Sequence, residues 1–260
     1  MKQTILILAA ILCFSCSKDN TSNITGGRVV FNAAVESSVT AQTKASSTTE
    51  LPAELIPNIK DFTLDVTGSY TDPETDEVKG YSFSYSSIYE QNEMSPFMTK
   101  GNYNGAIELG EKDIEGEGKA YFSGDADFAI TARNVTECTI NAKLSNSVIK
   151  LTTTEWFNKY YTSATFIVTT TLKNEYTYKI GEEMPLIFVN AGTTLTLSGT
   201  AIKTNGFTVE FPAKEIGTTK EQTLYNIVID ASEAGESGIK INFDDTVIDV
   251  PIDVELNPEV

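Results

Sequence analysis

The chain has 260 residues, with 36 acidic and 19 basic side chains, a formal net charge of −17 and no histidine. The absence of histidine excludes Ser-His-Asp and Cys-His catalysis and His-ligated zinc. The acidic surface repels nucleic acid and anionic lipid, so we predict no nucleic-acid partner. The length is typical of two domains of about a hundred residues each.

The amino terminus carries an export signal that ends in a cysteine. Residues 5–14 are an apolar run, followed by Ser15 and Cys16. This run is far shorter than the roughly 20 residues of a membrane-spanning helix. It resembles bacterial lipoprotein signals, which implies a signal peptide over residues 1–15, acylation of Cys16 with palmitate-type chains, and a lipidated tether over residues 16–27. An ordinary secretory signal with an incidental cysteine is the alternative.

The resemblance also implies a location. A lipid-anchored protein of this type is held in the outer membrane by its acyl chains, so the membrane is a partner only through that anchor. Lys18 and Asp19 directly follow the acceptor segment and resemble an export tag for the outer face. We therefore expect the protein to face the cell exterior.

Alternation of apolar and polar residues predicts strands along most of the remaining chain. Val29, Phe31, Ala33 and Val35 share one face of the first segment. Similar strands are predicted at residues 62–66, 81–85, 127–133, 164–171, 175–180, 186–190, 194–202, 207–211, 224–230 and 238–255, with a hairpin turn at 243–247 and one short helical turn at 156–161. Short β-branched strands broken by turn residues predict an all-β fold of two tandem antiparallel β-sandwich domains, transthyretin-like or Ig-like.

The change in strand pattern near Ser145 predicts the domain boundary. We expect an amino-terminal β-sandwich over residues 28–146 and a carboxy-terminal β-sandwich over residues 147–260. Residues 37–50 are rich in Ser and Thr and poor in apolar residues. Such a composition is typical of a loop or a cleavable linker.

Two short motifs carry a family resemblance. A G-x-Y step stands at Gly101 and Tyr103, and a Y-F-x-G-x-x-x-F step runs from Tyr121 through Gly124 to Phe128. In this order they resemble a large family of Bacteroidetes surface lipoproteins classed as a domain of unknown function. From the residues alone, we expect the glycines at turns with positive φ and the aromatic rings in the sandwich core.

The family is similar in outline to fimbrillins, which are two-sandwich lipoprotein precursors that polymerise into surface fibres. This similarity implies a pilus subunit or adhesin whose partners are other fimbrial subunits. Residues 29–35 would be the removable first strand, and Lys44 and Ala45 would be the proteolytic processing site. The vacated groove would then take a strand from the next subunit by β-strand addition.

An anchored glycan-binding module is the alternative function. Such modules stack aromatic rings on sugars, and Trp156, Tyr160 and Tyr161 are the candidate contacts with host or bacterial surface glycans. Thr246 follows an aspartate and precedes a valine, a pattern that resembles an O-glycosylation acceptor in exported proteins of this bacterial group. Core packing and ordinary turn chemistry explain the same residues equally well.

An enzyme is a third possibility, which we do not favour. Asp125 with Asp127, or Asp244 with Asp245, supplies paired carboxylates, but adjacent acids at turns are usually solvated. No spaced calcium loop is present, so we predict no metal and no cofactor. Once the signal is removed and Cys16 is acylated, Cys138 has no disulfide partner, and its alternating surroundings predict a buried apolar side chain.

Overall fold

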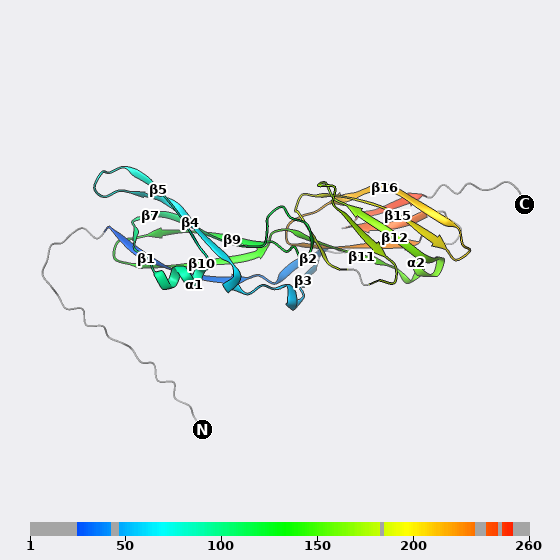
Figure 1. Cartoon of the computed structure of the whole chain (residues 1–260), viewed down its shortest axis with the longest axis horizontal. Helices are drawn as coiled ribbons and strands as arrows, with labels where there is room; N and C mark the ends of the chain where they lie inside the picture. Colours follow the sequence, from blue (N-terminus) through cyan, green and yellow to red (C-terminus); the bar gives the residue numbers. More distant parts are fainter. Residues whose placement is uncertain (1–24, 43–46, 183–184, 232–237, 244–245, 252–260) are drawn as a thin grey trace, which may run out of the picture.

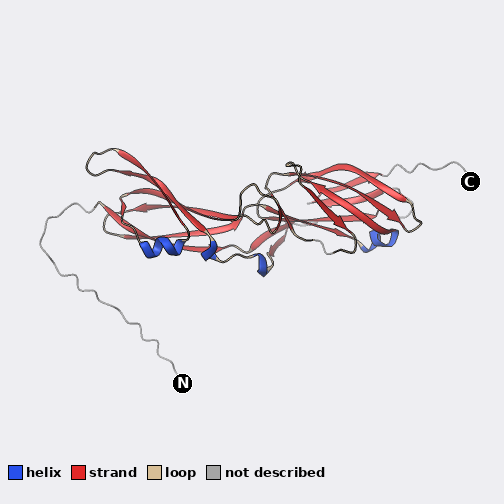
Figure 2. Ribbon diagram, in the orientation of Figure 1, coloured by secondary structure: helices blue, strands red, loops and turns tan. Residues whose placement is uncertain are grey.

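A computed structural model describes residues 25–42, 47–182, 185–231, 238–243 and 246–251. These residues form an elongated molecule whose strands run mostly along the long axis (Figure 1). The helical segments are short and few by comparison (Figure 2). They are η1 (Ala53–Leu55), η2 (Ile59–Asp61), α1 (Ile88–Met94) and α2 (Glu155–Tyr160). The predicted all-β fold is confirmed, and α2 matches the predicted helical turn.

The first sheet has seven strands, in the order β5, β4, β7, β9, β10, β1, β6. Their bounds are β1 (Gly26–Val35), β4 (Thr63–Thr71), β5 (Val78–Tyr85), β6 (Met98–Thr99), β7 (Gly101–Leu109), β9 (Phe122–Ile130) and β10 (Val135–Leu144). The ladder between β9 and β10 contains only the pairs at Lys143 and Leu144. The sheet folds over at this corner. As a result, Phe31 of β1 packs edge-on against Phe128 of β9, with ring centroids 5.3 Å apart.

The aromatic motif residues are buried, with Tyr103 and Phe128 in the first core, although the motif glycines are not where the sequence predicts. Tyr103, Tyr121 and Phe128 are buried as expected. Gly101 and Gly124 lie inside β7 and β9 rather than at positive-φ turns. A Cβ would lie 2.3 Å from the Ser69 carbonyl oxygen at the first and 2.2 Å from that of Asn141 at the second. Close approach of a neighbouring backbone, not φ, therefore requires glycine at both positions.

Two further sheets enclose the second core. One has the order β19, β18, β17, β11, β14, β8, with β2 added to β17 and β3 added to β2, and the other has the order β13, β12, β15, β16. The bounds are β2 (Ser38–Gln42), β3 (Ser47–Glu50), β8 (Gly116–Glu117), β11 (Ser147–Thr153), β12 (Tyr161–Thr169), β13 (Glu175–Lys179), β14 (Ile187–Val189), β15 (Thr194–Lys203), β16 (Thr208–Thr218), β17 (Thr223–Ala231), β18 (Gly238–Phe243) and β19 (Thr246–Pro251). Within the predicted 238–255 run, the described residues form two antiparallel strands, β18 and β19, in which Phe243 pairs with Thr246.

Among the described strands, three pairs are parallel. They are β1 with β10, β11 with β17, and β17 with β2. The sequence predicted only antiparallel sandwiches. Side-chain alternation is the same in parallel and antiparallel strands, so the sequence pattern carries no information about strand direction.

The predicted loop over residues 37–50 is wrong where the structure describes it. Residues 38–42 and 47–50 form β2 and β3, an antiparallel pair. β2 also pairs in parallel with β17, through Thr40, Ala41 and Gln42. The Ser- and Thr-rich sequence becomes strand because the backbone groups of β17 offer it a ladder, which outweighs its weak apolar pattern.

β14 joins the two cores through the alternation of its side chains. Ile187 and Val189 belong to the second core, whereas Phe188 between them belongs to the first. β11 does the same, with Val148 in the first core and Ile149 in the second. Only residues 145–146 separate β10 from β11. The two cores therefore meet without a flexible linker between them.

Glu115 adds a polar contact across this junction. Its carboxylate accepts hydrogen bonds from Thr170 Oγ1 at 2.7 Å, Asn174 Nδ2 at 2.9 Å, the Asn190 backbone N–H at 3.0 Å and Thr193 Oγ1 at 3.2 Å. Glu115 lies in the segment between β7 and β8, whereas all four donors lie in the second half of the chain. This one carboxylate therefore holds two turns of the second half, residues 170–174 and 190–193, against the segment before β8.

Glu115→Ala should lower the free energy of unfolding by about 2–4 kcal/mol, because it leaves the buried hydroxyls of Thr170 and Thr193 without their acceptor. Urea denaturation followed by circular dichroism measures this change. Glu111→Ala is the matched control, because its contact with Lys119 is an exposed pair at 3.9 Å that contributes little. Equal losses for the two variants would contradict the role given to Glu115.

Candidate functional site

The strand expected to be removable is β1, and its side chains are part of the first core. Val29 and Phe31 are fully buried, and Ala33 and Val35 pack against the same cluster. Fully burying an apolar side chain of this size contributes about 1.5–3 kcal/mol. β1 is therefore an integral strand, and its removal would open an apolar groove floored in part by Ile140, whose side chain lies near Phe31 across Gly105.

The backbone of β1 has a neighbouring strand along most of its length on one edge only. β10 runs beside it from Arg28 to Val35. On the other edge, β6 pairs only with Gly26 and Gly27. Beyond that point, the Asn92 side chain of α1 takes the place of a strand. It accepts from the Phe31 N–H at 2.8 Å through Oδ1 and donates to the Phe31 carbonyl oxygen at 2.8 Å through Nδ2.

Helix α1 was missed from the sequence, although a local signal was present. Ser87 is its N-cap and accepts a hydrogen bond from the Glu90 N–H at 3.2 Å. The Glu90 carboxylate reaches back to the Ser86 N–H at 2.6 Å, and this reciprocal pattern is close to a capping box. Hydrogen bonds from the Ser86 hydroxyl, at 2.7 Å, and from its backbone N–H hold the pKa of Glu90 below its ordinary value.

Gln91 is the unusual residue of α1. Its side chain is 1% exposed, and neither Oε1 nor Nε2 has a hydrogen-bond partner. A buried polar group without a partner costs about 1–3 kcal/mol. Gln91 therefore makes the packing of α1 less stable than an apolar residue of similar size would at this position.

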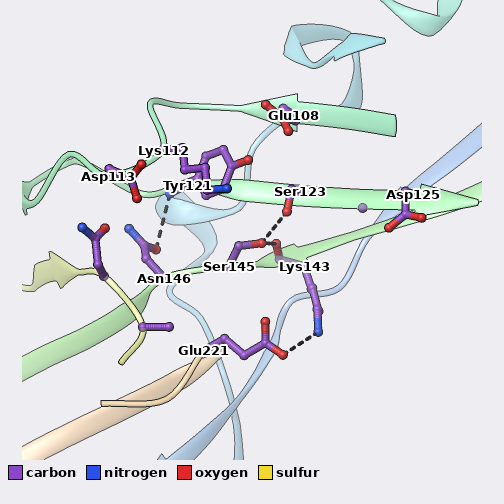
Figure 3. A pocket seen from close by; sticks show the side chains of 13 residues that line it. Glu108, Lys112, Asp113, Tyr121, Ser123, Asp125, Lys143, Ser145, Asn146 and Glu221 are labelled. Carbon is purple, nitrogen blue, oxygen red and sulfur yellow. Dashed lines mark hydrogen bonds and ion pairs between the residues drawn. The ribbon is translucent and has the colours of Figure 1, made fainter. Parts of the chain in front are cut away.

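A second candidate site is the cavity at the junction of the two cores, with a volume of about 500 Å³. Five segments from both halves of the chain line it, and their side chains are drawn in Figure 3. The lining residues are Glu108, Lys112, Asp113, Tyr121, Ser123, Gly124, Asp125, Lys143, Ser145, Asn146, Asn190, Ala191 and Glu221. Sequence reasoning missed this site because residues up to 113 positions apart meet there only in the folded chain.

Polar side chains hold one another in place around this cavity (Figure 3). Ser123 and Ser145 share a hydrogen bond at 2.7 Å, and Lys143 Nζ lies 3.1 Å from Glu221 Oε1. Burial, together with the neighbouring Glu108 carboxylate, raises the pKa of Tyr121 and keeps its phenol protonated. The Ser123 and Ser145 hydroxyls are thus held against each other at the cavity wall.

The charges of the lining limit what the cavity can accept. Glu108, Asp113, Asp125 and Glu221 oppose only Lys112 and Lys143, so the lining is net negative and disfavours anions. Apart from the Tyr121 ring, the apolar lining is limited to small residues such as Gly124 and Ala191, which offers little to an apolar ligand. A neutral ligand with many hydroxyl groups fits this set of donors and acceptors best.

The aromatic residues proposed for glycan contact do not form one platform. Trp156 is 39% exposed and packs at 5.1 Å against Tyr160. Lys159 Nζ lies 4.7 Å from the Trp156 ring centroid and covers one of its faces. Tyr161 is buried, where it stacks on Phe157 at 4.4 Å. Its ring is part of the second core, which leaves Trp156 and Tyr160 as the surface pair.

The other predicted residues occupy varied positions. Cys138 is buried, and burial with the nearby Asp127 charge raises its thiol pKa to about 11. Asp125 and Asp127 are exposed on β9, and both accept from Asn104 Nδ2, at 3.1 Å and 2.9 Å. Thr246 is the first residue of β19. Cys16, Lys44, Ala45, Asp244 and Asp245 lie outside the described residues.

In the described ranges, no three His, Cys, Asp or Glu side chains are grouped so that they could hold a metal ion. No helix within the same ranges has the length and apolar character required to cross a bilayer.

The fold defines an elongated all-β protein in which two apolar cores are joined end to end. The chain belongs to the family described as domain of unknown function DUF4493, whose model matches residues 26–258. This finding confirms the resemblance to a surface-protein family of unknown function. No curated protein matches the chain.

Solved structures show only distant similarity. A fimbrial assembly protein from Parabacteroides distasonis is 9% identical, with a TM-score of 0.42, and the match covers 74% of this chain and 91% of that one. The fimbrial anchor protein Mfa2 from Porphyromonas gingivalis is 10% identical, with a TM-score of 0.35, and covers 86% and 99%. At these values, neither similarity carries an argument about this chain.

Gln91→Met should raise the free energy of unfolding by about 1–2 kcal/mol, because methionine fills a similar volume without an unpaired amide. Thermal and urea denaturation measure the change. Glu93→Met, at an exposed position of the same helix, is the matched control that should leave the stability nearly unchanged. A loss of stability on replacing Gln91 would mean that its amide has a polar partner in solution.

Proposed function

We propose that this chain is a lipid-anchored surface subunit of the fimbrillin type, acting as a pilus subunit or adhesin and assembling by β-strand addition. The observation that supports this most directly is the position of β1. It is near the amino terminus, fills the first core with Val29 and Phe31, and has a full-length neighbouring strand on one edge only. Release of such a strand exposes both an apolar groove and unpaired backbone groups, which a donor strand satisfies.

Processing at Lys44 would have a further structural consequence. β2 lies on the amino-terminal side of this residue and pairs with both β3 and β17. Cleavage followed by release would therefore remove β1 from the first sheet and β2 from the second. Both losses must occur before an assembled subunit could form, which couples strand exchange to the carboxy-terminal half.

The experiment is to express the precursor in a Bacteroidetes host and to determine the amino terminus and mass of the material on intact cells. We expect a new terminus at Ala45 and a ladder of oligomers, and Lys44→Gln should abolish both. Lys60→Gln, at an exposed position of η2, is the control that should leave processing unchanged. A surface protein that keeps its acylated Cys16 terminus and stays monomeric would contradict assembly by strand exchange.

The second candidate is capture of a neutral glycan, and the junction cavity is the observation that favours it. The hydroxyl and carboxylate groups of its lining match the hydroxyl groups of a sugar. Binding through these polar groups needs no aromatic platform. Carboxylate acceptors form charge-assisted hydrogen bonds that are stronger than neutral ones.

Saturation-transfer NMR with neutral mono- and disaccharides tests this second candidate. We expect binding that Ser145→Val weakens by about tenfold, the loss of one net hydrogen bond of about 1–1.5 kcal/mol. Ser84→Val on the exposed strand β5 is the control. Binding that both variants leave unchanged would place the sugar elsewhere, and the surface pair of Trp156 and Tyr160 would then be tested.

A further inference from the structure

The open edge of β1 has a regular set of backbone groups. The Arg28 N–H donates to the Asn134 carbonyl oxygen at 3.0 Å and the Glu36 N–H donates to that of Ala142 at 2.8 Å. In a parallel ladder, alternate residues bond to the same neighbour. The even-numbered residues of β1 therefore face β10. The N–H and C=O groups of Val29, Phe31, Ala33 and Val35 face away from it.

Helix α1 and the turn after it lie against this edge. Asn92 makes the two hydrogen bonds to Phe31 that a partner strand would make. One turn later, the Arg28 guanidinium donates to the carbonyl oxygen of Ser95, a residue with φ of 41°. The Asn92 carboxamide thus takes the place of a peptide group of a neighbouring strand. Asn92 and Phe31 are 61 residues apart in sequence.

The charges of β1 indicate what would pair with it once this cover is absent. The strand is uncharged from Val29 to Val35, with Arg28 before it and Glu36 after it. Two copies of β1 placed antiparallel about Asn32 would put Arg28 of each copy opposite Glu36 of the other. Opposite charges at facing positions stabilise such a pair, and a two-fold axis makes the contact twice.

The hydrogen-bonding pattern agrees with this register. Pairing about Asn32 places Phe31 opposite Ala33 and Val29 opposite Val35 of the second copy. These are the odd-numbered residues, whose backbone groups are directed away from β10. In an antiparallel ladder, such residues form the hydrogen-bonded pairs, while Arg28 and Glu36 fall in a non-hydrogen-bonded pair, where side chains lie closer.

We propose that α1 is a cover over the edge of β1, closed by Asn92, that prevents two copies of this chain from pairing there through β1. The cover is a single short helix with the unpaired amide of Gln91 beneath it, so opening it requires only local unfolding. This inference does not rest on the proposed function, because it concerns the chain before any processing.

The test is sedimentation velocity on the full chain, produced with Cys16→Ala in every variant so that acylation cannot drive association. We expect Asn92→Ala to convert monomer into dimer and to speed amide hydrogen exchange at Phe31 by about tenfold or more. Glu93→Ala, at an exposed position of the same helix, should remain monomeric.

Two second-site changes distinguish strand pairing from general aggregation. Ala33→Pro removes an N–H on the open edge and should return Asn92→Ala to the monomer. Arg28→Glu should also weaken that dimer, and Glu36→Arg added to Arg28→Glu should restore it. If Asn92→Ala does not fold, Asn92→Asp takes its place, because it keeps the acceptor and loses only the donor.

The proposal is overturned if the folded variant stays monomeric, or if association is unaffected by Ala33→Pro. Either result leaves processing at Lys44 untouched, so failure of this inference and failure of the proposed function give different measurements.

Discussion

The alternation of side chains along β14 is the constraint on which the rest of this structure depends. A strand presents successive residues to opposite faces, so a strand between two cores must be apolar on both. Ile187 and Val189 face the second core, and Phe188 faces the first. Because β11 repeats this arrangement, the two halves share a continuous interior, which fixes the walls of the junction cavity and lets Glu115 reach its four donors.

β1 combines packed side chains with an open backbone edge. Its side chains contribute to a packed interior, whereas half of its backbone groups face an edge with no strand beyond Gly27 among the described residues. Natural sheets protect such edges by covering or interrupting them. Here the cover is a side-chain carboxamide on a seven-residue helix. Asn92 satisfies the N–H and C=O groups of Phe31. Displacing it breaks far fewer hydrogen bonds than displacing a paired strand would.

The hairpin of β2 and β3 links this strand to the far half of the molecule. β2 follows β1 directly and adds to the ladder of β17, so the amino-terminal segment takes part in both sheets. A change at its end is therefore felt in both cores. This connection offers a physical route by which a change in the amino-terminal segment reaches the second sheet.

By itself, the sequence determined which residues face inward. The period of two in Val29, Phe31, Ala33 and Val35 identified β1, and the neighbours of Cys138 identified it as a core residue, because burial of apolar surface acts on each strand locally. Partner choice was decided only by the tertiary structure. The parallel pairing of β1 with β10, the parallel pairing of β2 with β17, and the pairing of Asn92 with Phe31 all join segments far apart in sequence. A backbone hydrogen bond is the same for every residue type, so no local pattern specifies which segment will supply it.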